Sequence, residues 1–115
     1  MTHLSLKTCE ALKAVGMPQE TVFWYVENQY GDGFSLKMPL PKGGVARKFA
    51  CPTIEEMLEM LGQRFIGMAL STIGYAVYGR DTEYGTLPTK HVNSEANDSP
   101  AEALAQLLLE VRPWN

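Results

Sequence analysis

The sequence predicts a single α+β domain over residues 1–115, with three helices on a mainly antiparallel sheet in the order α-β-β-(β)-α-β-β-α. Apolar residues recur at helical spacing in three segments and alternate in shorter ones between them. Short connections between successive strands favour antiparallel pairing, whereas a doubly wound parallel sheet needs a helix between its strands. A chain of 115 residues that is 45% hydrophobic and 20% charged can bury one core and is too short for two.

The first helix is expected over Leu4–Gly16. Ser5 suits the N-cap because its side-chain oxygen can accept a hydrogen bond from a free backbone N–H of the first turn. Gly16 suits the position after the last turn, where the left-handed conformation favours glycine. One face repeats every three residues and is expected to be buried: Cys9, Leu12 and Val15.

Two strands and a shorter third one are expected next. Thr21–Val26 is rich in β-branched and aromatic residues, and the turn residues of Asn28–Gly33 lead into the alternating segment Phe34–Met38. The alternation is expected to point three side chains inward: Phe34, Leu36 and Met38. After a loop rich in proline and glycine, Ala46–Cys51 is expected to add the third strand.

The second helix has the strongest start signal in the chain. Thr53 and Glu56 have the spacing of a capping box, in which each side chain accepts a hydrogen bond from the other residue's backbone N–H. Gly62 is expected to end this helix. Apolar residues fall at i, i+3, i+4 and i+7 along it: Ile54, Met57, Leu58 and Leu61.

A second strand pair follows this helix. Phe65–Thr72 and Tyr75–Gly79 are expected to form two strands joined by a tight turn. Residues 80–98 contain many turn-forming residues, so most of this stretch is expected to be a loop. One edge strand is expected within it, around Lys90–Val92.

The last helix is expected to start after Ser99, with Pro100 in its first turn and Glu102 completing a second capping box. Pro113 is expected to stop it. At ~1.5–3 kcal/mol for each buried side chain, its apolar face makes the helix integral to the fold. That face comprises Leu104, Leu107, Leu108 and Val111.

Four segments together carry a family resemblance: Leu4–Lys13, Ala50–Thr53, Gly74–Tyr78 and Ser99–Leu104. In these segments the chain resembles a loose family of short proteins encoded by phages, prophages and conjugative elements of gut anaerobes. The resemblance covers most of the chain and implies a mobile-element origin and the same order of helices and strand pairs. The function of that family is unknown, so the resemblance implies no site.

A cytoplasmic location without a membrane partner is expected. Met1–Lys7 has no positive segment followed by an apolar run, as a secretory signal would. The uncharged stretch Phe65–Gly79 is shorter than the ~20 residues that cross a bilayer. Cys9 and Cys51 lack CxxC spacing and lie in apolar patterns, which is typical of a reducing compartment.

No catalytic, cofactor or metal site is predicted, and an enzyme is the less favoured class. His3 and His91 have no Cys, Asp or Glu at metal-ligand spacing. Cys51 lies two residues before the Thr53 N-cap and is the better placed of the two candidate nucleophiles. An inert, half-buried thiol is nevertheless the favoured interpretation, because no activating residue accompanies it.

The segment from Lys37 to Lys48 is the strongest candidate for nucleic-acid contact. It lies between Phe34 and Phe49, so it could hold phosphates while bases stack on the rings. Its cations are Lys37, Lys42, Arg47 and Lys48. The alternative is that these charges protect an exposed hairpin edge from aggregation. We favour the alternative, because a net charge of −3 gives no general attraction to nucleic acid.

The favoured function is therefore a non-enzymatic phage or mobile-element accessory or protein-interaction domain. A weak nucleic-acid-binding accessory protein that uses residues 37–48 is the alternative. Aromatic residues are concentrated around the first strand pair: Phe23, Trp24, Tyr25, Tyr30 and Phe34. A domain of this size is not expected to bury them all, so they are expected to form an interface with an unidentified protein or in a homodimer.

Overall fold

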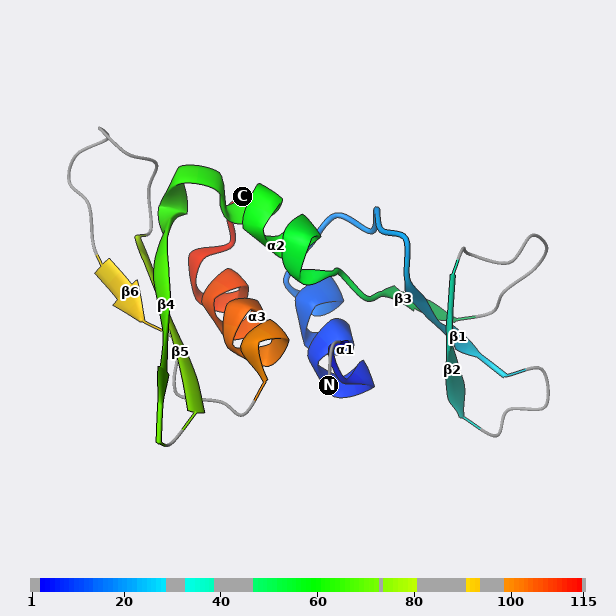
Figure 1. Cartoon of the computed structure of the whole chain (residues 1–115). Coiled ribbons are helices and arrows are strands. Elements are labelled where there is room, and N and C mark those ends of the chain that lie inside the picture. The colour runs from blue at the N-terminus through cyan, green and yellow to red at the C-terminus, as the bar shows by residue number, and fades with distance from the viewer. Residues whose placement is uncertain are drawn as a thin grey trace.

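A computed structural model describes residues 3–28, 33–38, 47–72, 74–80, 91–93 and 99–114 (Figure 1). Most of the predicted turn at 28–33 and of the loop at 80–98 lies outside the described residues. The elements, in chain order, are α1 (Leu6–Ala14), β1 (Trp24–Glu27), β2 (Phe34–Lys37), β3 (Lys48–Ala50), α2 (Ile54–Leu61), a 3-10 turn (Gly62–Arg64), β4 (Phe65–Ser71), β5 (Gly74–Arg80), β6 (His91–Asn93) and α3 (Pro100–Val111).

The described strands form two antiparallel sheets, where one sheet was expected. The N-terminal sheet has the order β2-β1-β3, and the C-terminal sheet has the order β4-β5-β6. Figure 1 shows the two sheets at opposite ends of the molecule with the helices between them. They are separate because β3 packs on α1, whereas β5 and β6 pack on α3. The α+β class, the antiparallel pairing and the order of the elements are confirmed.

The last helix lies at the centre of the packing. It contacts α1, α2, β5 and β6. Its buried residues are Ala101, Ala103, Leu104, Ala105, Leu107 and Leu108. Val111, the last member of the predicted apolar face, is half-buried because it lies at the end of the helix. The buried face is therefore broader than predicted, since alanines extend it on either side of the leucines.

The three α-helices begin at the predicted N-caps. In each case a hydroxyl oxygen accepts a hydrogen bond from the backbone N–H three residues later, at 3.2 Å for Ser5, 3.1 Å for Thr53 and 3.3 Å for Ser99. Glu56 completes the predicted capping box on α2 by accepting from the Thr53 N–H at 2.8 Å. Gly16 has a φ of 94° after α1, as expected of the residue that ends a helix in the left-handed region.

The C-terminal sheet lies against α3 through β5. Val77 is fully buried there. At Gly79, a Cβ atom would come within 2.8 Å of both the Leu107 side chain and the Arg64 backbone oxygen, so the approach of strand to helix requires glycine. The register pairs Met68 with Val77, which places β4 beside β5 at the edge of the sheet.

Three details of the strands differ from the sequence-based expectations. Met38 was expected to point inward, but β2 ends at Lys37 and the Met38 side chain is 58% exposed. The first strand begins at Trp24, three residues later than expected, although the Phe23 carbonyl oxygen still accepts a hydrogen bond from the Cys51 N–H at 2.9 Å. The edge strand expected around Lys90–Val92 is found one residue later, as β6.

Candidate interaction surfaces

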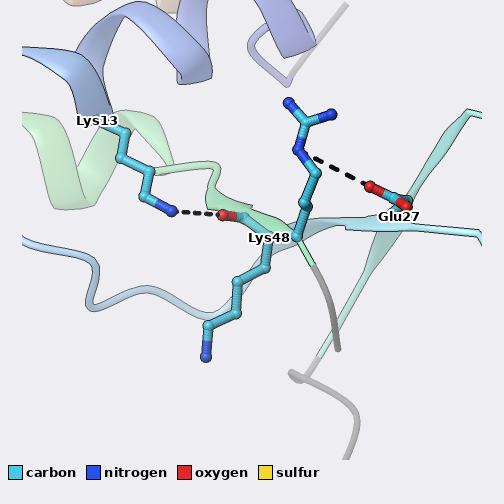
Figure 2. Close-up of polar contacts among 4 residues, drawn as sticks. Lys13, Glu27 and Lys48 are labelled. Atoms are coloured by element: carbon cyan, nitrogen blue, oxygen red, sulfur yellow. Dashed lines mark hydrogen bonds and ion pairs between the residues drawn. The ribbon is translucent and has the colours of Figure 1, made fainter. Parts of the chain in front are cut away.

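The basic segment is divided between the two faces of the N-terminal sheet. Lys37 lies opposite Trp24, and Lys48 lies opposite Val26, so both lysines share the face that carries Trp24. The Lys48 ammonium is 5.5 Å from the centre of the Trp24 ring. Figure 2 shows the Lys48 side chain directed away from Lys13 and Glu27. Lys42 lies outside the described residues.

Arg47 lies over aromatic rings on the opposite face. Its guanidinium carbon is 5.4 Å from the centre of the Phe34 ring and 5.8 Å from that of Phe49, and the two ring centres are 5.7 Å apart. The Arg47 Nε is 3.8 Å from a carboxylate oxygen of Glu27 (Figure 2). These contacts balance part of the arginine charge within the sheet, although the Arg47 side chain remains 60% exposed.

Lys13 of α1 joins this group of residues. Its Nζ is 5.0 Å from the centre of the Phe49 ring and donates a hydrogen bond to the Lys48 carbonyl oxygen at 3.1 Å (Figure 2). We call Lys13, Arg47, Phe34 and Phe49 the cation–aromatic cluster. Lys13 could not be predicted as part of this group, because its position in the periodicity of the helix faces water and its contact with the sheet forms only when the chain folds.

Four of the aromatic residues predicted to form an interface are described, and each contacts other residues of the chain. Trp24 is 7% exposed, and its Nε1 donates to the Thr21 carbonyl oxygen at 3.0 Å. The Tyr25 hydroxyl donates to the Leu4 carbonyl oxygen at 2.6 Å, and burial raises the pKa of Tyr25. The Phe23 ring lies 4.7 Å from that of His3, centre to centre. Phe34 belongs to the cation–aromatic cluster, and Tyr30 lies outside the described residues.

The exposed apolar side chains of the described residues are concentrated on the second strand pair. On β4, Ile66 is 47%, Met68 is 36% and Leu70 is 68% exposed, and Tyr78 on β5 is 39% exposed. We call Ile66, Met68 and Leu70 the β4 surface. The other large apolar side chains that are exposed are Val22 and Met38. The sequence predicted this strand correctly, but it could not predict that the strand lies at an edge.

The β4 surface extends beyond the cover that α3 provides. Met68 lies opposite Val77 and Leu70 lies opposite Tyr75, so these four side chains share the face of the sheet that packs on α3. Val77 on the middle strand is fully buried, whereas Leu70 on the edge strand is 68% exposed. Figure 1 shows the β4–β5 hairpin continuing past the helix. The helix therefore covers the middle strand and leaves the apolar edge strand in contact with water.

The two cysteines, predicted as separate core residues, lie together. Cys9 of α1 is fully buried, and Cys51, between β3 and α2, is 1% exposed. The Cys9 thiol forms a hydrogen bond with Cys51, and this bond together with burial raises the pKa of Cys9 well above its usual range. The same hydrogen bond lowers the pKa of Cys51, against the opposing effect of burial. Both side chains are buried, so neither thiol is open to a reagent in the native fold.

Acidic side chains of the described residues line one hollow of the surface. Among these residues, no three His, Cys, Asp or Glu side chains are grouped as metal ligands would be. A hollow of about 330 Å³ is lined by Pro18, Glu20, Glu56, Glu59 and Met60. The Glu56 carboxylate there accepts hydrogen bonds from Thr21 Oγ1 and Thr53 N, so it serves the α2 N-terminus.

Comparisons with protein-family models, with curated proteins and with solved structures give no match for this chain. In the described part of the chain, none of the helices combines the length and apolar character that crossing a membrane requires. The inference of function therefore rests on the surfaces themselves.

Proposed function

We propose that this chain is a non-enzymatic protein-interaction domain that acts through the β4 surface, as an accessory protein of phage or mobile-element type in the cytoplasm. The observation that carries the proposal is the exposure of Ile66, Met68 and Leu70 on one edge strand. The proposal that the protein is of phage or mobile-element type rests on the resemblance of four segments of the sequence to short phage and prophage proteins. The two free thiols in the core fit the reducing compartment that is expected.

The energetics of the β4 surface favour a protein partner. Covering three roughly half-exposed apolar side chains contributes on the order of 2–4 kcal/mol before the cost of association is subtracted. An edge strand adds its outward-facing backbone N–H and C=O groups, which pair with a strand from a partner. Apolar contact and backbone pairing thus act at the same place, as they do where a partner extends a sheet.

A photocrosslinking experiment tests this function. The full chain carrying p-benzoylphenylalanine in place of Leu70 is expressed in the host and irradiated. We expect a crosslinked protein that nuclease treatment and high salt leave in place, because apolar contact and backbone pairing depend little on salt. The matched control replaces Val22, which is 50% exposed and distant from β4 in the sequence. Equal crosslinking from both positions, or no protein adduct from position 70, would contradict the proposal.

Nucleic-acid binding through the cation–aromatic cluster is the second candidate. The observation that favours it is Arg47, which is 60% exposed and lies over two aromatic rings. Binding of this kind falls steeply as salt concentration rises, because phosphate contacts release counterions. Affinity for a labelled single-stranded oligonucleotide that drops with salt and is lost in Arg47→Glu, but not in Leu70→Lys, would establish this candidate in place of the first.

A further inference from the structure

We infer that the partner of the β4 surface is a second copy of this chain, and that the two β4 strands pair antiparallel about a two-fold axis. The two C-terminal sheets then join into one continuous sheet. This inference rests on the proposed function and names the occupant of the same surface.

The strand β4 is the least protected edge among the described strands. It has seven residues, whereas the edge strands β2, β3 and β6 have four, three and three. Lys37 lies on β2 and Lys48 on β3, and a lysine on an edge strand discourages pairing with another chain. From Phe65 to Ser71 there is no charged residue and no proline. The register of β4 against β5 is irregular between Phe65 and Gly67, so the regular part of this edge is 67–71, which is still longer than the other edge strands.

The strand is complementary to itself in an antiparallel arrangement. With the two-fold axis at Met68, each Met68 lies opposite its equivalent, and Leu70 of one copy lies beside the irregular segment of the other copy that contains Ile66. The exposed apolar side chains of the two copies thus contact one another, and each copy buries apolar surface that is exposed to water in the single chain. A two-fold axis perpendicular to the sheet also keeps both α3 helices on the same face, so the two copies of β4 share one apolar face between them.

The distribution of charge allows a second copy at this edge, because 65–71 carries no charged residue. The chain has a net charge of −3, so two copies repel weakly at long range and approach most easily through a neutral surface. The nearest charged residue before β4 is Arg64. In the antiparallel pair, the two Arg64 residues lie at opposite ends, about 27 Å apart at 3.4 Å per residue. That separation exceeds the Debye length of about 8 Å at physiological salt, so the two Arg64 charges are screened from each other.

Sedimentation velocity of the purified full chain over a concentration series tests the inference. We expect the mass to rise from 12.8 kDa to twice that value as concentration increases. Leu70→Lys and Met68→Lys should each raise the dissociation constant of the dimer at least tenfold, because a lysine would enter an apolar strand pair. Val22→Lys, at an exposed apolar position outside the sheets, should leave the dissociation constant unchanged.

A cysteine placed on the axis reports the register directly. Opposite residues in an antiparallel pair have Cα atoms about 4.5–5.5 Å apart, which is within the range that a disulfide bridges. Met68→Cys should therefore form a disulfide-linked dimer under mild oxidation, and Val22→Cys should not. Cys9 and Cys51 are buried and should not contribute to the crosslink.

Two outcomes would overturn the second copy as partner. One is a monomeric mass at several hundred micromolar. The other is a dimer that Leu70→Lys leaves intact, which would move the interface to another surface, such as the aromatic residues of the N-terminal sheet. A monomeric purified chain whose position 70 still crosslinks to a different protein in cells would reject the second copy and retain the proposed function.

Discussion

At the scale of single residues, the carbonyl oxygen of Leu4 joins two side chains from the N-terminal half of the fold. It accepts a hydrogen bond from the Tyr25 hydroxyl at 2.6 Å and a weaker one from the Cys51 thiol at 3.9 Å. Cys9, one turn into α1, packs against Cys51 in the same place. These polar contacts inside an apolar core fix Leu4, the residue before the N-cap of α1, to β1 and to the start of α2.

The buried thiols should react slowly in the native protein. Burial is the common cause, since the pKa of Cys9 is raised whereas that of Cys51 is lowered. Because both side chains are buried, an aromatic disulfide reagent at neutral pH should label native Cys9 and Cys51 much more slowly than the same residues in urea. The release of thiophenolate measures both rates. Cys9→Ala and Cys51→Ala separate the two residues, and rapid labelling of native Cys51 would restore it as a candidate nucleophile.

At the scale of helices and strands, a carboxylate of α3 caps the N-terminus of α1. The two oxygens of Glu102 accept hydrogen bonds from the Ser5 N–H at 2.7 Å and from the Thr8 hydroxyl at 2.6 Å. The first turn of α1 has no acidic residue of its own, so Glu102 supplies the negative charge that a helix N-terminus favours. Glu102 was expected to complete a capping box on α3, but the hydrogen bonds of its carboxylate go to α1, so this residue ties two helices together.

Glu102→Ala should lower the free energy of unfolding by about 1–3 kcal/mol, because two hydrogen bonds to a charged acceptor are lost. Urea unfolding followed by circular dichroism measures this difference. Glu110→Ala is the matched control, since Glu110 is exposed on the same helix and undergoes the same change in helix propensity. Equal losses in the two variants would show that the link between the helices contributes nothing to stability.

At the scale of the whole molecule, the fold is elongated. The radius of gyration is 15.1 Å, whereas a compact chain of this length is expected near about 13 Å. The sheets occupy the two ends, and the helices between them hold most of the fully buried side chains of the described residues (Figure 1). Both sheets rely on this central layer, so we expect neither to remain folded when the helices separate.

Leu108→Ala tests that dependence. Leu108 is fully buried on α3, and its truncation should cost about 2–5 kcal/mol through lost apolar contact and a residual cavity. In a Trp114→Phe background, the fluorescence of Trp24 in the N-terminal sheet and helical circular dichroism should shift together in urea as one transition. Leu109→Ala, at a half-buried neighbour, should cost less. An unchanged midpoint for Leu108→Ala would remove α3 from the core.

The sequence by itself determined where the helices start and which class of fold forms. Ser5, Thr53 and Ser99 cap their helices through contacts three residues away, and such local contacts are visible in the order of residues. The periodicity that predicts helices and strands is local in the same way. The N-terminal boundaries of the α-helices, the alternating strand pairs and the antiparallel arrangement were therefore predictable.

The tertiary structure alone decided how these elements meet. No local pattern encodes the division into two sheets, the contact of Cys9 with Cys51 or the hydrogen bond from the Ser5 N–H to Glu102. Each of them depends on residues that lie far apart in the sequence. The same holds for the β4 surface. Ile66, Met68 and Leu70 would be core residues in a middle strand, and they form a candidate interface because β4 lies at the edge that α3 leaves uncovered.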